Sequence, residues 1–135
     1  GSPYSGVISL FIEALANGKA PTILGDGRQT RDFTFVTDVV RGVLAACTAP
    51  NVSGEVFNVA VGGRISLLDL VGTLQRLLGT DVEPVFGPAR EGDIRDSQAD
   101  IVRARQMLDY EPQVSFEDGL RATVEWYKST LARSR

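Results

Sequence analysis

The sequence predicts a small mixed α/β domain. Segments in which apolar residues recur every three or four positions alternate with short segments rich in β-branched and aromatic residues. The chain has 135 residues, and 43% of them are apolar. This length and this composition are typical of one globular domain with its own hydrophobic core.

The first predicted element is a helix near the start of the chain. Its apolar positions are Val7, Ile8, Phe11, Ile12 and Leu15. This spacing is that of one helix face. Ser5 is expected to be its N-cap, and Asn17-Gly18 is expected to end it.

Two glycines separate the next two predicted strands. The first strand covers residues 22–24, and the second covers 31–36, where aromatic and polar residues alternate. Gly25 and Gly27 tolerate the backbone conformations that tight turns require. We therefore interpret this region as a hairpin.

A second helix is expected to end before Pro50. Its apolar stripe consists of Val36, Val39, Val40, Val43, Leu44 and Cys47. We expect this stripe to face the core. Cys47, the only cysteine, would then be a small buried residue that forms no internal disulfide. A β-rich segment, residues 55–61, follows.

A strongly amphipathic helix begins the second half of the chain. Ser66 is expected to open it and Gly79 to close it. A strand over 82–86 follows, and Asp100 is expected to cap a short helix that ends near Leu108. These signals extend the alternation of helices and strands.

The last predicted helix begins with a capping box. Ser115 is followed three positions later by Asp118, as that motif requires. The core face of this helix is expected to consist of Leu120, Val124, Tyr127 and Leu131.

Composition excludes several functional classes. The net charge is −3, and the chain has no histidine and one cysteine. We therefore expect no metal site and no histidine base. Without a basic run, we expect no nucleic-acid partner. No apolar run reaches the roughly 18 residues that span a bilayer, and no signal peptide is recognisable, so we expect a cytoplasmic protein with no membrane partner.

The stretch GDGRQT, residues 25–30, resembles the start of a dinucleotide-binding loop. That fingerprint needs a third small residue and must run from a strand into a helix, whose N-terminal amides hold the phosphates. Here Thr30 occupies the third position, and a strand is predicted next. We therefore expect Arg31, rather than the glycines, to contact a phosphate, because its planar fork of donors suits phosphate oxygens.

A second arginine, Arg90, precedes Glu91-Gly92-Asp93 in a polar loop. Two guanidinium groups that converge from separate loops could neutralise a diphosphate, and Asp93 could accept from a ribose diol. The alternative is that these arginines pair with neighbouring acids at the surface, where such pairs contribute less than about 1 kcal/mol. The spacing leaves both interpretations open.

A resemblance extends over nearly the whole chain. The segments that carry it are SPYSGVISLFI, PTILGDGRQTRDF, VTDVVRGV, FNVAVGGRISLLDL, REGDIRDSQADI and SFEDGLRATVEWYK. They resemble the carboxyl-terminal half of the NAD-dependent nucleotide-sugar epimerase/dehydratase family, the extended short-chain dehydrogenases, and especially its UDP-glucose 4-epimerase-like members. In that family this half is the smaller substrate-binding domain, which packs against a Rossmann domain that holds NAD.

The resemblance implies roles for three charged residues. Arg31 and Arg90 resemble the two arginines that grip the diphosphate of the nucleotide sugar. Asp93 resembles the acid that holds the ribose. Ser97 stands where some relatives have a tyrosine that reaches the substrate, so no role is carried over to it.

The resemblance also implies contacts to the rest of the nucleotide. The strand of Thr22, Ile23 and Leu24 resembles the one whose main chain pairs with the uracil edge. Ser5-Gly6 lies where a helix N-terminus faces the phosphates. Phe33 stands where the family has an aromatic residue near the nucleotide, although a core position explains it equally well.

The family's catalytic parts are not found in this sequence. Tyr4, Tyr110 and Tyr127 all lack the lysine four positions later that the family's Tyr-x-x-x-Lys pair requires. The resemblance therefore implies that residues 1–135 are the substrate domain of a longer NAD-dependent enzyme whose Rossmann half is absent. We expect this chain alone to be inactive, to have no catalytic residue and to bind no NAD.

Removal of a partner domain would expose apolar surface. We therefore expect the isolated chain to form a homo-oligomer or a segment-swapped dimer, through its N-terminal helix.

Three functions remain open at this point. The first is the substrate domain of a UDP-sugar 4-epimerase, and the second is the same domain in a nucleotide-sugar dehydratase or decarboxylase. The third is a non-catalytic module that binds nucleotide sugars or associates with itself. The reaction type depends largely on residues of the other half.

Overall fold

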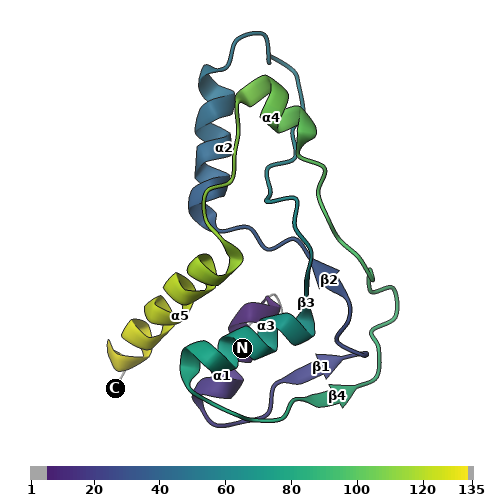
Figure 1. Ribbon diagram of the computed structural model, residues 1–135, viewed down its shortest axis with the longest axis vertical. Coiled ribbons are helices and arrows are strands. Elements are labelled where there is room, and N and C mark those ends of the chain that lie inside the picture. Colours follow the sequence, from purple (N-terminus) through teal and green to yellow (C-terminus); the bar gives the residue numbers. More distant parts are fainter. Residues whose placement is uncertain (1–5, 134–135) are drawn as a thin grey trace.

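The computed structural model describes the backbone of residues 6–133 and the side chains of residues 6–130. Its elements in chain order are α1 (Val7–Ala16), β1 (Thr22–Leu24), β2 (Thr30–Arg31), α2 (Val36–Thr48), β3 (Ile65–Ser66), α3 (Leu67–Leu78), β4 (Val85–Gly87), α4 (Val102–Leu108) and α5 (Phe116–Arg133). The molecule is elongated, with α1, α3, α5, β1 and β4 towards one end and α2 beside α4 at the other (Figure 1). The predicted mixed α/β class is confirmed.

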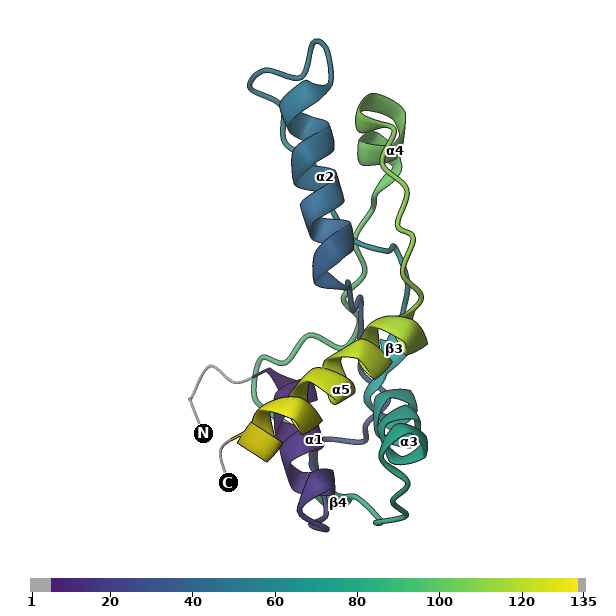
Figure 2. The ribbon, with the colours of Figure 1, turned by 90° about the vertical axis from the view of Figure 1, so that its left-hand side faces the viewer.

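The main core lies where α1, α3 and α5 pack together with β1. Figure 2 shows α5 crossing this end of the molecule, and α3 contacts both α1 and α5. The buried residues are Phe11, Ile12, Leu15, Ile23, Leu67, Leu70, Val71, Leu74, Leu120 and Val124. Burial of each large aliphatic side chain contributes about 1.5 to 3 kcal/mol. These residues include Phe11, Ile12 and Leu15 of the first predicted stripe and Leu120 and Val124 of the last. The side chain of Leu131 lies outside the described residues.

Local capping signals place both ends of α3 and the start of α5 as predicted. Ser66 and Asp69 form a complete capping box, and Gly79 closes α3 in the left-handed conformation with φ of 70°. At α5, the Asp118 N–H donates to Ser115 Oγ at 3.1 Å. Side-chain oxygens thus satisfy N-terminal amides that no helical carbonyl can reach.

Two other cap predictions are shifted by one residue. The N-cap of α1 is Gly6, which makes no side-chain cap bond, while Ser5 lies outside the described residues. The N-cap of α4 is Ile101 rather than Asp100, although Asp100 Oδ1 accepts from the Val102 N–H at 2.9 Å. Asp100 thus caps a first-turn amide from one position further out.

The strands correct the predicted hairpin. β1 pairs in parallel with β4, and β2 pairs antiparallel with β3, so the strands on either side of the glycine turn belong to different sheets. Gly25 and Gly27 do have positive φ, 89° and 74°. The expected strand over 31–36 ends at Arg31, because the pairing of β2 with β3 covers only Thr30 and Arg31, and α2 begins at Val36.

The β-rich segment 55–61 is not a strand in this structure. The described strand pairs do not include it. Some of its backbone groups instead bond to side chains, since the Ala60 carbonyl accepts from the buried Tyr110 hydroxyl at 2.9 Å. A strand needs a neighbouring edge to satisfy its backbone, and composition alone does not provide one.

The orientation of α2 is the main departure from the sequence predictions. Its buried residues are Asp38 and Gly42, and Val36, Val39, Val40, Val43, Leu44 and Cys47 are exposed. A Cβ on Gly42 would lie 2.4 Å from Val59 Cγ1, so only glycine permits this close approach. The prediction that the stripe and Cys47 are buried is therefore wrong, because the smallest and one charged residue of the helix face inward.

Two aspartates connect distant segments through backbone amides. The Asp38 carboxylate accepts from the N–H groups of Gln113 and Val114, both at 3.0 Å. The Asp32 carboxylate accepts from the N–H groups of residues 61, 62 and 99, at 3.3, 2.9 and 3.2 Å. Each aspartate therefore positions loops that secondary structure does not hold.

None of the described helices combines the length and the apolar character that crossing a membrane requires.

Candidate functional site

Arg31 and Arg90 line the same cavity, although they are 59 positions apart in the chain. The cavity has a volume of about 240 Å³, and its walls include Val7 and Leu10 of α1, Thr22 and Leu24 of β1, and Asp93. A second hollow of about 370 Å³ also contains Arg31, Arg90 and Asp93 and extends to Ser97. The structure therefore brings the two predicted arginines and the predicted aspartate together.

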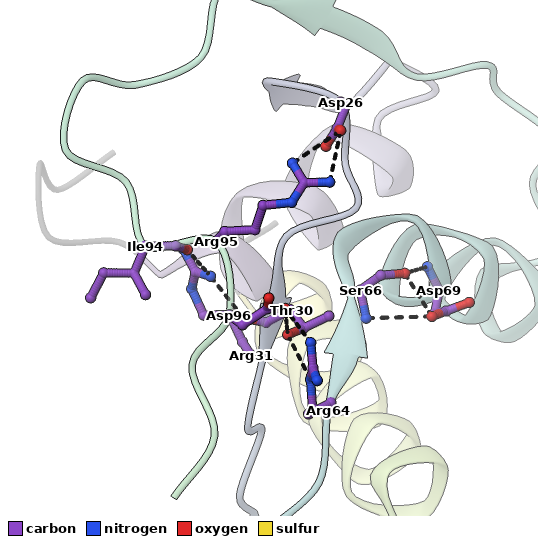
Figure 3. Close-up of polar contacts among 9 residues, drawn as sticks. All are labelled: Asp26, Thr30, Arg31, Arg64, Ser66, Asp69, Ile94, Arg95 and Asp96. Carbon is purple, nitrogen blue, oxygen red and sulfur yellow. Dashed lines mark hydrogen bonds and ion pairs between the residues drawn. The ribbon is translucent and has the colours of Figure 1, made fainter.

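The Arg31 guanidinium is fixed by three hydrogen bonds. Its Nη1 donates to the carbonyls of Thr30 at 2.8 Å and Ile94 at 2.6 Å, and its Nη2 pairs with Asp93 Oδ1 at 2.6 Å. Figure 3 shows Arg31 reaching towards Ile94. A guanidinium has five N–H donors, so two remain for a ligand. With 27% of its side chain exposed, Arg31 is accessible from the cavity.

A turn presents Arg90 and Asp93 to the same space. The Asp93 N–H donates to the Arg90 carbonyl at 3.1 Å, and Gly92 has φ of 75°. A positive φ at the third residue is typical of a type II turn, which favours glycine there. Among the described residues, the exposed Arg90 side chain has no ion-pair or hydrogen-bond partner. Its guanidinium is therefore available to an anion.

The side chains of β1 point alternately to the cavity and to the core. Ile23 is fully buried, whereas Thr22 and Leu24 line the cavity. The Pro21 carbonyl and the Gly25 amide bond to β4, so strand alternation directs the main-chain groups of Thr22 and Leu24 to the opposite edge.

Gln29 is a cavity residue that the sequence analysis did not single out. Its side chain is 7% exposed, and its Nε2 donates to the Leu24 carbonyl at 2.6 Å. Gln29 thereby supports the edge of β1 beside the cavity. Its only sequence signal is its place in the polar stretch that also carries Arg31. The apolar wall from α1 had no such signal, since Val7 was expected in the core and Leu10 was not singled out.

The remaining predicted site residues lie in different places. Gly6 caps α1 and precedes the cavity residue Val7, while Ser5 lies outside the described residues. Phe33 packs against Phe116 with ring centroids 5.7 Å apart, and lines a separate cavity of about 60 Å³. The structure does not bring Phe33 together with Arg31 and Arg90.

Two ionised carboxylates, those of Asp96 and Asp26, lie close to the segment that carries Arg90 and Asp93. Hydrogen bonds from the Thr30 hydroxyl and from Arg64 hold the pKa of Asp96 below its usual value. The Arg28 backbone N–H, followed by the Arg95 side chain, lowers the pKa of Asp26. These charges lie outside both hollows, so the cavity itself keeps two guanidinium groups beside Asp93 and apolar walls. Such an arrangement suits a phosphorylated ligand with an apolar part.

The comparisons with known proteins agree with this description. Residues 1–60 match the family model described as the NAD dependent epimerase/dehydratase family. A UDP-glucose 4-epimerase of Mycolicibacterium smegmatis is 40% identical over 125 residues, which are 93% of this chain and 40% of that protein. A UDP-N-acetyl-alpha-D-glucosaminuronate decarboxylase of Bacillus cytotoxicus is 31% identical, over 93% of this chain and 41% of that protein.

The fold is shared with solved structures as well. The crystal structure of a UDP-glucose 4-epimerase from Thermotoga maritima with UDP-glucose superposes with a TM-score of 0.89 at 40% identity. The match covers 96% of this chain and 42% of that one. The chain thus spans about 40% of the length of the curated relatives that it matches.

Proposed function

Because the chain belongs to the NAD-dependent epimerase/dehydratase family, we propose that it is the substrate-binding domain, in the carboxyl-terminal part, of a UDP-sugar 4-epimerase. The observation that carries this proposal is the shared cavity of Arg31 and Arg90. A diphosphate group carries about two negative charges, and bidentate arginine contacts suit it better than those of lysine.

In this proposal each cavity residue contacts a different part of the nucleotide. Arg31 uses its two remaining donors, and Arg90 its whole guanidinium, on the diphosphate. Asp93 holds Arg31 through Oδ1 and accepts from the ribose through its other oxygen. The main-chain edge of Thr22 and Leu24 pairs with the base. The sugar lies outside these contacts, so its identity is set elsewhere in the longer enzyme.

NAD would supply the hydride chemistry of the longer enzyme, in a family described as NAD dependent. The glycine turn of this chain does not fit that cofactor, because β1 leads through Gly25 and Gly27 into β2 rather than into a helix. No helix N-terminus is therefore available there for a pyrophosphate. We propose that NAD and the catalytic Tyr-x-x-x-Lys pair belong to the remainder of the enzyme.

A decarboxylase of the same family is the second candidate. The relative from Bacillus cytotoxicus carries that activity in its name and matches 93% of this chain. Both reactions start from a UDP-sugar, so the proposed role of the cavity is the same. Release of CO2 from a UDP-hexuronate by the full-length protein, compared with its 4-epimerisation of UDP-glucose, would distinguish the two activities.

The proposal is tested by isothermal titration of the 135-residue chain with UDP, UDP-glucose and uridine. We expect saturable binding of UDP and UDP-glucose, with uridine much weaker because it lacks the diphosphate. A chain that is folded by circular dichroism and yet binds none of these ligands would contradict the proposal.

We further propose that the exposed stripe of α2 is covered by the rest of the longer enzyme, and that the isolated chain associates through it. Val43 and Leu44 are 54% and 62% exposed, while α1 buries Phe11, Ile12 and Leu15. An unpartnered aliphatic helix face of this kind favours association. The interface is therefore expected at α2 rather than at the N-terminal helix.

Sedimentation equilibrium tests this expectation. The wild-type chain should form dimers or larger species at high concentration, and Val43→Asp should remain a monomer. Val56→Asp is the matched control, since Val56 is 78% exposed and lies outside the stripe. A wild-type chain that stays monomeric, or a control that dissociates as readily as Val43→Asp, would refute the role of α2.

A further inference from the structure

The loop that carries Arg90 and Asp93 is fastened to β2 directly after it passes the cavity. The Thr30 N–H donates to the Arg95 carbonyl at 2.8 Å, and the Ser97 N–H donates to the Thr30 carbonyl at 3.1 Å. Thr30 and Asp96 thereby form a parallel bridge. Because Arg31 follows Thr30, the register of this bridge sets where Arg31 lies relative to the loop.

Three side chains strengthen this bridge, and we call them the Asp96 clamp: Thr30, Arg64 and Asp96. The Thr30 hydroxyl donates to Asp96 Oδ1 at 2.7 Å, and Arg64 Nη2 pairs with the same oxygen. Arg64 Nε also approaches Thr30 Oγ1 at 3.4 Å. Figure 3 shows Arg64 extending from the segment before β3 to meet Thr30. The clamp therefore joins three segments that are distant in the sequence.

The clamp does not line the cavity. Thr30, Arg64 and Asp96 contribute to neither hollow that contains the arginines. The side chains of Arg64 and Asp96 are both 50% exposed, so they are not needed to fill a core. The position of the Arg31 side chain depends on the register of the same bridge, because its Nη1 donates to the Ile94 carbonyl, two residues before Asp96. Any effect of the clamp on a ligand must then pass through Arg31 or the Arg90 turn.

We propose that the Asp96 clamp is a positioning device that holds Arg90 opposite Arg31 and thereby sets the affinity for the diphosphate. This inference rests on the proposed function of the cavity. If the clamp is weakened, the loop leaves its register, and the two guanidinium groups no longer meet one ligand. An exposed ion pair in a merely structural role would affect folding slightly and binding not at all.

A double-mutant cycle separates these two roles. UDP affinity is measured for the wild-type chain, Asp96→Asn, Arg90→Ala and the double variant. We expect Asp96→Asn to weaken UDP binding about tenfold, and to have little further effect once Arg90 is alanine. Asp96→Glu, which keeps the charge, should recover part of the affinity. Glu111→Gln removes the exposed partner of Arg105 on the far end of the molecule and should leave UDP binding unchanged.

The outcomes distinguish this inference from the one on which it rests. If the wild-type chain binds UDP and Asp96→Asn binds it equally well, the clamp has no positioning role and the proposed function stands. Equal losses with and without Arg90 would likewise overturn the inference, since the clamp would then act independently of that side chain. A folded wild-type chain that does not bind UDP would overturn both.

Discussion

Replacement of Arg31 by alanine is expected to weaken UDP binding by about 1.5 to 3 kcal/mol, the range for a hydrogen bond to a charged group. This corresponds to roughly a tenfold to hundredfold rise in Kd. The physical reason is the loss of the guanidinium donors that face the cavity and that no neighbouring side chain replaces. Isothermal titration with UDP measures the effect.

Two further variants make the result specific to Arg31. Arg28→Ala removes the same charge from the adjoining glycine turn, outside both hollows, and should leave the affinity nearly unchanged. Arg31 also holds Asp93 and Ile94, so its removal can loosen the loop. Arg90→Ala removes no such internal bond and should still weaken binding. Unchanged UDP affinity in Arg31→Ala would exclude Arg31 from the site.

Replacement of Asp38 by asparagine is expected to lower the free energy of unfolding by about 1 to 3 kcal/mol. The Asp38 side chain has no exposed surface, and its carboxylate accepts from the backbone N–H groups of Gln113 and Val114. An amide has only one acceptor oxygen, so at least one of these part-buried N–H groups would lose its partner. Urea denaturation measures the loss. Asp81→Asn, at an exposed position, should change the free energy of unfolding by less than about 0.5 kcal/mol.

The same aspartate predicts how stability depends on pH. Burial raises the pKa of Asp38, but hydrogen bonds from Gln113, Val114 and Arg41 outweigh burial and hold that pKa below 3.8. A carboxyl with a lowered folded-state pKa adds stability that is fully present above its unfolded value, and this stability is lost as the pH falls towards the folded value. Wild type should therefore lose more stability than Asp38→Asn between about pH 5 and pH 3. If the free energy of unfolding fell equally with pH in the two proteins over this range, the result would contradict this assignment.

Much of the local structure could be predicted from the sequence. The helix from Leu67 to Leu78 follows from its apolar spacing, its capping box at Ser66 and its terminal Gly79. All of these signals act over four residues or fewer, so they do not depend on the rest of the fold. The strand over 22–24 is confirmed for a similar reason, because a short apolar segment between turn residues has few alternatives.

Residues that require a distant partner could not be predicted in the same way. The segment 55–61 has a strand composition but no paired edge among the described residues. Phe33 could be assigned to the core or to the nucleotide, and only its contact with Phe116 shows where it packs. Strand alternation places Ile23 on the face opposite to its neighbours, but only the packing shows that Ile23 faces the core and that Thr22 and Leu24 face the cavity.

The sequence by itself determined where the helices lie, how α3 and α5 are capped, and which arginines could contact a phosphate, because periodicity and side-chain chemistry are local properties. Only the tertiary structure decided which helix face is buried, since α2 turns Asp38 and Gly42 inward and its aliphatic stripe outward. It also decided that Arg31 meets Asp93, across 62 positions of the chain. Such contacts depend on how whole segments pack, and no local pattern records them.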